Sequence, residues 1–314
     1  MLNYISRRLV LLLIVVLGVT IMTFALMNLA PGDPAEMIAM ARYGLENLTV
    51  EEVEHIRISE GLDAPVWIQY MHWLAHALRG DFGRSLVTGD PVLQEIIVRA
   101  PATLMLALAS LIVSLLIAIP AGIISAAKQN SLLDYLARSG ALLGASMPNF
   151  WLALLLILLF SVTLGWLPVF GYGELRHIIL PAVTLGTGLA AVSTRLIRSS
   201  MLEVLEQDYI TTARAKGLRE GNIISRHAFK NAFIPVITVI GLQLGHLLEG
   251  TVIVESIFGW PGLGKLLVDS IFARDYALIQ ACVLLFAVFF VLINLLVDIL
   301  YVYLDPRIRY EKKG

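Results

Sequence analysis

The chain has 314 residues, of which 58% are hydrophobic and 15% are charged, and its mean hydropathy is +0.81. This composition is too apolar for a soluble domain of this length and indicates an integral membrane protein. The net charge of -1 leaves no large basic face, which argues against nucleic acid as a partner. The only cysteine is Cys282, so an internal disulfide is excluded.

The first apolar run extends from Leu9 to Ala30 and follows Arg7 and Arg8. A signal-peptide core has about 7–15 apolar residues, and this run is longer. It therefore predicts a retained transmembrane helix within residues 1–30. The basic residues before it place the N-terminus in the cytoplasm.

Residues 31–100 are rich in Asp and Glu and predict an extracytoplasmic insertion after the first helix. Within it, the spacing of apolar residues predicts an amphipathic helix over Val66–Leu78, lying on the membrane or on the spans. Its predicted apolar face contains Trp67, Tyr70, Met71, Leu74 and Leu78. His72 and His76 on the other face could share a metal ion, but no third ligand is near in sequence. We interpret them as part of a solvated polar face.

Five further apolar runs predict spans in the rest of the chain, at about 101–127, 134–165, 177–197, 232–258 and 276–304. Pro101 is expected to open the first of these spans. The sequence Ser146-Met147-Pro148-Asn149 predicts a bent or broken helix in the second. Gly186 and Gly188 are small enough to let neighbouring helices approach closely. The expected fold is an all-α membrane protein with six transmembrane helices.

The distribution of basic residues supports this topology. The segments 1–8, 128–138, 195–231 and 305–314 hold 15 of the 23 Lys and Arg residues. The three predicted outer segments hold the other 8, although they are longer in total. Both termini are therefore predicted to be cytoplasmic. The domain prediction is a first helix at 1–30, an insertion at 31–100, a five-helix core at 101–304 and a tail at 305–314.

The longest polar interruption in the second half of the chain is Arg195–Pro235, which includes the cytoplasmic loop 195–231. Its centre, residues 208–217, is rich in helix formers and stops at Gly217, which suits a helix C-cap. We expect a short exposed helix that a cytoplasmic partner protein holds in place. The alternative is a solvated loop whose basic residues only set the topology.

One glycine-rich stretch, Gly259–Lys265, has the glycine and lysine spacing of a phosphate-binding P-loop. The next residue, Leu266, cannot bind magnesium, and the segment is predicted to face outward. We expect a turn that folds back toward a pore mouth. No other stretch indicates a catalytic or metal site, so the chain is not expected to be an enzyme.

Several co-linear motifs together resemble the first permease subunit of the dipeptide, oligopeptide and nickel ABC importers. They are RSSMLEVLEQDYITTARAKGL at 198–218, HAFKNAFIPVIT at 227–238, ESIFGWPGLG at 255–264, PGDP at 31–34 and DPRIRY at 305–310. The resemblance covers essentially the full chain and implies the type I ABC importer permease fold. The predicted loop helix is similar to the EAA motif, which docks on an ATPase subunit in that family. Thr211-Thr212 replaces the Glu-Ala of the general pattern, and Pro235 lies further from Gly217 than that pattern has it.

The resemblance implies that residues of the loop couple ATP hydrolysis to transport. They are Asp208, Tyr209, Thr212, Ala213, Arg214, Ala215, Lys216 and Gly217. The implied partners are a second homologous permease, two ATP-binding cassette subunits, a periplasmic or lipid-anchored substrate-binding protein and membrane lipid. ATP and magnesium would bind to the ATPase subunits, and this chain would hold no cofactor. The implied location is the bacterial inner membrane.

Three polar residues in the fifth span, Gln243, His246 and Glu249, fall on one helical stripe. Polar groups at mid-membrane usually face a cavity or a partner, so these residues are candidates for the translocation path. A buried structural contact with the companion permease is the other interpretation. Peptides are the leading substrate, because most of the resemblance is to the peptide branch. Nickel or a metal chelate and glutathione are alternatives within the family, and a channel or membrane scaffold is the alternative outside it.

Overall fold

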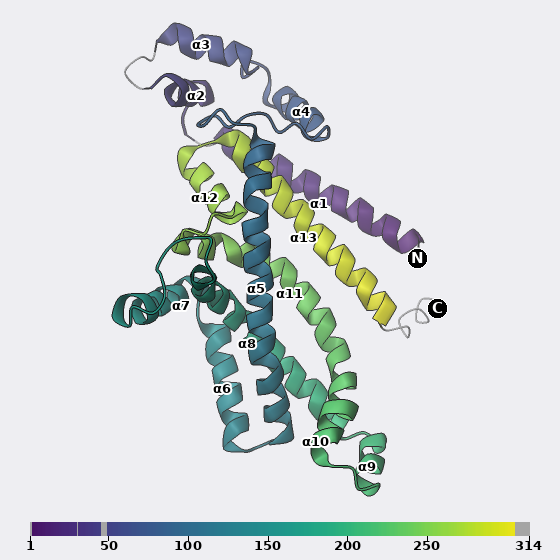
Figure 1. Ribbon diagram of the computed structural model, residues 1–314. Helices are drawn as coiled ribbons and strands as arrows, with labels where there is room; N and C mark the ends of the chain where they lie inside the picture. The colour runs from purple at the N-terminus through teal and green to yellow at the C-terminus, as the bar shows by residue number, and fades with distance from the viewer. Residues whose placement is uncertain (1, 30, 45–48, 305–314) are drawn as a thin grey trace. The chain divides into compact units, whose positions relative to one another are not determined.

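The structure, a computed structural model, describes residues 2–29, 31–44 and 49–304 (Figure 1). All regular elements in these residues are helices, and the one β interaction among them is an isolated bridge between Arg84 and Pro91. The chain divides into two compact units, residues 1–103 with 261–291 and residues 104–260 with 292–314. The predicted all-helical architecture is confirmed.

The first unit contains the helices around the insertion. They are α1 (Leu2–Leu29), α2 (Pro34–Tyr43), α3 (Val50–Ser59), α4 (Val66–Ala77), the start of α5 (Val92–Ala127), α12 (Leu263–Ala273) and the first part of α13 (Tyr276–Leu304). Asp33 caps α2 by accepting a hydrogen bond from the Ala35 N–H, and Pro34 follows at the first helical position, where its missing N–H costs nothing. Thr49 and Glu52 form a capping box that starts α3.

Helix α4 confirms the amphipathic helix that the sequence predicted. It packs on α1 through Tyr70, whose hydroxyl lies 3.0 Å from that of Thr20 and whose ring contacts Phe24 edge-on. Trp67, Met71 and Leu78, which the pattern placed on the same face, remain exposed, and α4 ends at Ala77, one residue before the predicted end. Helix α1 therefore covers only the part of the predicted apolar face that contains Tyr70.

The second unit contains the rest of α5 and the predicted core. Its other elements are α6 (Leu132–Ser146), α7 (Asn149–Leu156), the π-helix η2 (Ile157–Thr163), α8 (Leu175–Leu205), α9 (Asp208–Ala215), α10 (Glu220–Asn222), the π-helix η3 (Ile223–Ala228), α11 (Phe229–Phe258) and the end of α13. Helices α6 and α8 pack together, and so do α8 and α11. Helix α8 therefore lies at the centre of the unit.

The break predicted at Pro148 is confirmed. Helix α6 ends at Ser146, Met147 is extended, and the following helix turns away by 107°. Proline lacks an N–H and disfavours the helical conformation of the residue before it, so α6 cannot continue through this position.

The predicted span at 101–127 starts at a different residue in the structure. Pro101 was expected to open the helix, but α5 begins at Val92 and continues through Pro101. Val92 and Ile96 are buried in a cluster with Leu266 of α12, and this packing favours a helix before the proline. The predicted end at Ala127 is confirmed.

Among the described residues, four helices are long and apolar enough to cross a membrane singly, namely α1, α5, α8 and α13. Three bent helix pairs raise the number of candidate spans to as many as seven. The predicted spans at 134–165 and 232–258 fall on two of these pairs. The remaining pair joins the end of α11 to α12, where the sequence predicted a segment that folds back.

Candidate functional site

The predicted loop helix is present as α9, which covers Asp208–Ala215. It ends as the sequence indicated, because Gly217 has a φ of 76°. The Gly217 N–H donates to the Arg214 carbonyl at 2.9 Å, and the Leu218 N–H donates to the Ala213 carbonyl at 3.3 Å. This pair of hydrogen bonds is the Schellman motif, so the predicted C-cap is confirmed.

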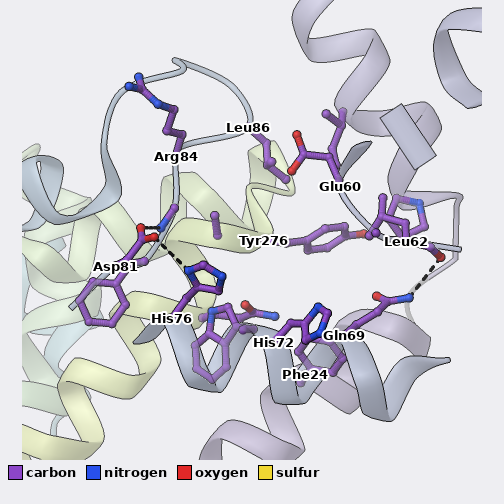
Figure 2. A pocket seen from close by; sticks show the side chains of 18 of the residues that line it. Phe24, Glu60, Leu62, Gln69, His72, His76, Asp81, Arg84, Leu86 and Tyr276 are labelled. Atoms are coloured by element: carbon purple, nitrogen blue, oxygen red, sulfur yellow. Dashed lines mark hydrogen bonds and ion pairs between the residues drawn. The ribbon is translucent and has the colours of Figure 1, made fainter. Parts of the chain in front are cut away.

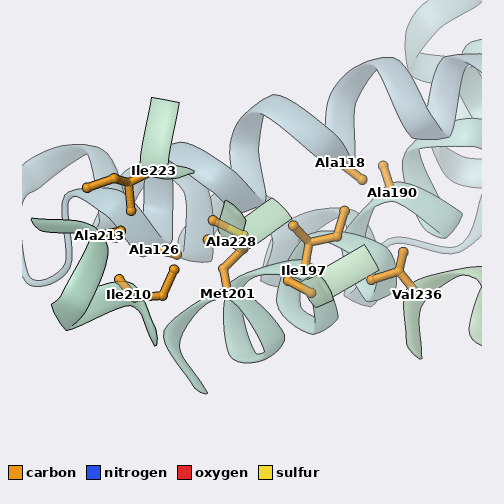
Figure 3. Close-up of a cluster of buried hydrophobic side chains, with 11 residues drawn as sticks. Ala118, Ala126, Ala190, Ile197, Met201, Ile210, Ala213, Ile223, Ala228 and Val236 are labelled. Carbon is orange, nitrogen blue, oxygen red and sulfur yellow. The ribbon is translucent and has the colours of Figure 1, made fainter. Parts of the chain in front are cut away.

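Helix α9 is anchored to its own chain by two apolar side chains (Figure 3). Ile210 is fully buried and Ala213 is 8% exposed. Their cluster includes Ile197 and Met201 of α8 and Ile223 at the start of η3. The chain itself therefore holds one face of this helix, through α8 and η3, and the expectation that a partner protein contacts α9 stays a prediction.

Two polar contacts add to this anchoring. The Asn231 amide of α11 donates to the Tyr209 hydroxyl at 2.8 Å, and Arg214 forms an ion pair with Glu220 at 2.7 Å. These contacts and the apolar cluster attach α9 to the end of α8 and to the start of α11.

The predicted coupling residues separate into two groups. Ala213 faces the cluster, whereas the other seven are exposed. The exposed group is Asp208, Tyr209, Thr212, Arg214, Ala215, Lys216 and Gly217. The helix therefore presents a polar surface with one apolar face already buried, which is suited to contact another protein.

The stripe predicted for the translocation path lies on α11. Gln243 is 7% exposed, accepts a hydrogen bond from the Ser193 hydroxyl at 3.1 Å and donates to the Leu189 carbonyl at 3.4 Å. Its amide is thus held by α8 of the same chain. The side chains of His246 and Glu249 lie outside the described part of the chain. The assignment of the three residues to a path stays a prediction.

A buried carboxylate in α6, Asp134, was not singled out by the sequence. It is fully buried and accepts hydrogen bonds from the Arg198 guanidinium at 2.8 and 2.9 Å, from the Ser125 hydroxyl at 2.6 Å and from the Asn130 N–H at 2.9 Å. The available signal was a lone Asp and a lone Arg, each inside a predicted span or at its edge. An isolated charge is costly in a membrane, so the two could have been predicted to pair.

The insertion contains a pocket of about 450 Å³ in the first unit (Figure 2). Phe24, Leu62 and Tyr276 contribute apolar surface, and His72 and His76 lie along one side. His76 contacts Asp81 at 3.1 Å. The Gly83 N–H and then His76 hydrogen-bond to Asp81 and lower the pKa of that carboxyl below its usual range. The two histidines thus belong to a pocket wall, in which His76 is paired with a carboxylate.

The segment with P-loop-like spacing forms a turn between two helices. Gly259 has a φ of 62° and closes α11, and the Trp260 N–H donates to the Glu255 carbonyl at 2.8 Å. The Trp260 ring is fully buried and lies edge-on to the Tyr172 ring, with 4.8 Å between the ring centroids. Because a helix precedes this turn where a P-loop requires a strand, the structure agrees with the turn interpretation.

Comparison with protein families gives two matches that together cover most of the chain. Residues 118–310 match the family described as "Binding-protein-dependent transport system inner membrane component". Residues 1–107 match the N-terminal family of membrane components of the same transport systems.

Similar proteins include the glutathione transport system permease protein GsiC of Escherichia coli (strain K12). It is 45% identical over 311 residues, which cover 99% of this chain and 100% of the relative. The dipeptide transport system permease protein DppB of Alkalihalophilus pseudofirmus is 43% identical, with the same coverage of both chains.

Two solved structures share the fold. An inward-facing structure of the MetNI methionine ABC transporter has a TM-score of 0.58 and 19% identity, and the match covers 68% of this chain and 97% of that one. An amino acid ABC transporter crystallised with histidines has a TM-score of 0.51 and 15% identity, and the match covers 66% and 93%. The fold is therefore that of the permeases of type I ABC importers.

Proposed function

This chain belongs to the family of binding-protein-dependent transport system inner membrane components, and we propose that it is the permease subunit of an ATP-driven importer of short peptides. The observation that carries this proposal is the full-length similarity to permeases named for glutathione and for dipeptides. Glutathione is itself a short peptide, so both names fit one substrate class. The chain is a multi-pass inner-membrane protein, and no ATP hydrolysis is assigned to it.

The proposed partners are a second permease, two ATPase subunits and a substrate-binding protein. ATP and magnesium would bind to the ATPases. Helix α9 would dock on an ATPase through its exposed residues, including Thr212 and Ala215. Its attachment to α8 and α11 supports this role, because a docked helix drives transport only if its movement shifts the spans.

The translocation path is proposed to run past the α11 stripe at Gln243, His246 and Glu249. Polar residues inside spans support such an assignment in general. If Glu249→Gln left both uptake rate and substrate preference unchanged, Glu249 would have no place in the path. The proposed orientation, with both termini cytoplasmic, rests on the distribution of Lys and Arg.

The test is substrate-stimulated ATPase activity and uptake by the assembled importer in lipid vesicles, with its binding protein. Glutathione, a dipeptide mixture, and nickel with and without free histidine are compared. Stimulation by glutathione or dipeptides is the expected result. Stimulation by nickel complexes alone would overturn the peptide class and make His246 the first residue to mutate. Absence of any ATPase that co-purifies with the chain would overturn the importer and favour a channel.

A further inference from the structure

A second pocket, of about 440 Å³, lies beside α6 and α8 in the second unit. Its lining contains three arginines, Arg138 of α6 and Arg195 and Arg198 of α8. The other three lining residues are Tyr135, Ser139 and Leu142, so no acidic side chain lines it. A pocket of this kind concentrates positive charge at one place on the membrane-spanning surface.

The charge of these arginines is only partly neutralised within the chain. Arg198 is paired with Asp134. Among the residues that the structure describes, neither the Arg138 side chain nor the Arg195 side chain has an ion pair or a hydrogen bond, and both residues are exposed. Two guanidinium groups without a carboxylate repel each other in a weakly polar environment, and a bound anion removes that repulsion. The pocket therefore carries positive charge that no carboxylate among its lining residues neutralises.

The predicted topology puts the three arginines at the cytoplasmic ends of their spans, because they fall in the segments 128–138 and 195–231, so the pocket is expected near the cytoplasmic membrane surface. Arg138 is about 9 Å along α6 from its first residue, Leu132, at 1.5 Å per residue. Arg195 is about 15 Å from the end of α8 at Leu205, by the same measure. Polar headgroup regions extend about 5–8 Å beyond the hydrocarbon on each side. Long arginine side chains can reach such a region from just inside the hydrocarbon.

The surroundings of the pocket are apolar and exposed. Tyr135 is 54% exposed and Leu142 is 61% exposed, and on the same helix Leu136 and Leu143 are exposed as well. Acyl chains are the natural contact for large apolar side chains on a membrane-spanning helix, and tyrosine is common at the headgroup level. An anion that brings its own apolar chains fits both features at once.

We propose that the arginine pocket formed by Arg138, Arg195 and Arg198 binds the phosphodiester headgroup of an anionic phospholipid. Arg138 and Arg195 contact the phosphate oxygens, because a guanidinium can donate two parallel hydrogen bonds to an oxyanion. Arg198, whose side chain is held by its ion pair with Asp134, forms one wall of the pocket. Tyr135 and Leu142 lie against the glycerol and acyl chains. This site is separate from α9 and does not depend on which peptide is transported.

The test uses the full-length chain in nanodiscs of phosphatidylcholine, with and without phosphatidylglycerol. Lipids that remain bound are identified by native mass spectrometry, and the midpoint of thermal unfolding is measured. The test variant is Arg138→Gln with Arg195→Gln, which leaves the Asp134–Arg198 pair intact. The matched control is Arg219→Gln with Arg226→Gln, which removes two exposed arginines outside the pocket. A third variant, Arg138→Lys with Arg195→Lys, keeps the charge.

The expected result is preferential retention of phosphatidylglycerol by the wild type and by the control. The glutamine variant should lose this preference about tenfold or more, since each basic residue near an anionic surface contributes severalfold in affinity. The lysine variant should recover much of it. If the double glutamine variant does not fold, Arg138→Gln and Arg195→Gln are measured singly, and each should lose severalfold.

Two outcomes would overturn the proposal. One is equal retention of phosphatidylglycerol by the glutamine variant and the wild type. The other is stabilisation of the wild type in pure phosphatidylcholine by inorganic phosphate or glutathione, to the same extent as phosphatidylglycerol provides. That result would make the pocket a site for small soluble anions. Either outcome leaves the proposed peptide import unaffected, because uptake is measured separately.

Discussion

The Arg198 guanidinium of α8 donates two hydrogen bonds, of 2.8 and 2.9 Å, to the carboxylate of Asp134 in α6. The carboxylate is fully buried and also accepts hydrogen bonds from Ser125 of α5 and from the backbone of the turn between α5 and α6. One side chain therefore joins α5, α6 and α8. Arg198 and Asp134 form an ion pair, so removing one charge leaves the other without its partner.

We predict that Asp134→Asn destabilises the protein by at most about 3–5 kcal/mol, the usual cost of leaving a buried charge unpaired, because the Arg198 side chain that loses its partner is still 20% exposed. The free energy of unfolding is measured by denaturant titration in mixed micelles. The control is Asp269→Asn, which breaks the more exposed ion pair with Lys265 and should change stability by less than about 1 kcal/mol. Equal effects of the two changes would contradict a structural role for Asp134.

Ile210 should be essential for the order of α9. Ile210→Ala removes a fully buried side chain from the cluster with Met201 and is expected to cost about 2–5 kcal/mol of local stability. Hydrogen exchange of the α9 amides should accelerate accordingly. Leu218→Ala, at a position that is 43% exposed, should leave the exchange nearly unchanged. Slow exchange in the Ile210 variant would show that α9 does not depend on this cluster.

Much of this organisation could be predicted from sequence, because the signals are local. Gly217 stops a helix by its own conformational freedom, and Pro148 breaks one by its missing N–H. The Asp134–Arg198 pair and the burial of Ile210 could not be predicted in the same way. Both depend on which helices become neighbours, and residues 134 and 198 are far apart in sequence. The start of α5 was missed for the same reason, since packing of Val92 against α12 overrides the proline signal.

The burial of Ala213 makes it a poor position for testing coupling, because a change there also disturbs the packing of α9. Ala213→Glu places a charge in the apolar cluster, so we expect faster hydrogen exchange in α9 as well as loss of transport. Ala215→Glu alters only the exposed face. It should preserve exchange rates and still reduce substrate-stimulated ATPase activity and uptake by at least about tenfold, if α9 docks on an ATPase. Wild-type uptake by Ala215→Glu at normal expression would argue against docking through this face.

Two nearby glycines of α8 provide a matched test of close helix packing. A Cβ on Gly186 would lie 2.8 Å from the Ser110 carbonyl oxygen of α5, whereas a Cβ on Gly188 would meet only Asn149 at 3.6 Å, an ordinary contact. Gly186→Ala must push α5 and α8 apart and should destabilise the protein by about 1–3 kcal/mol. Gly188→Ala meets no clash and gains up to about 1 kcal/mol from its higher helix propensity. Denaturant titration of both variants should therefore give changes of opposite sign. A stabilising Gly186→Ala change would mean that α5 and α8 do not approach at Ser110 in the membrane.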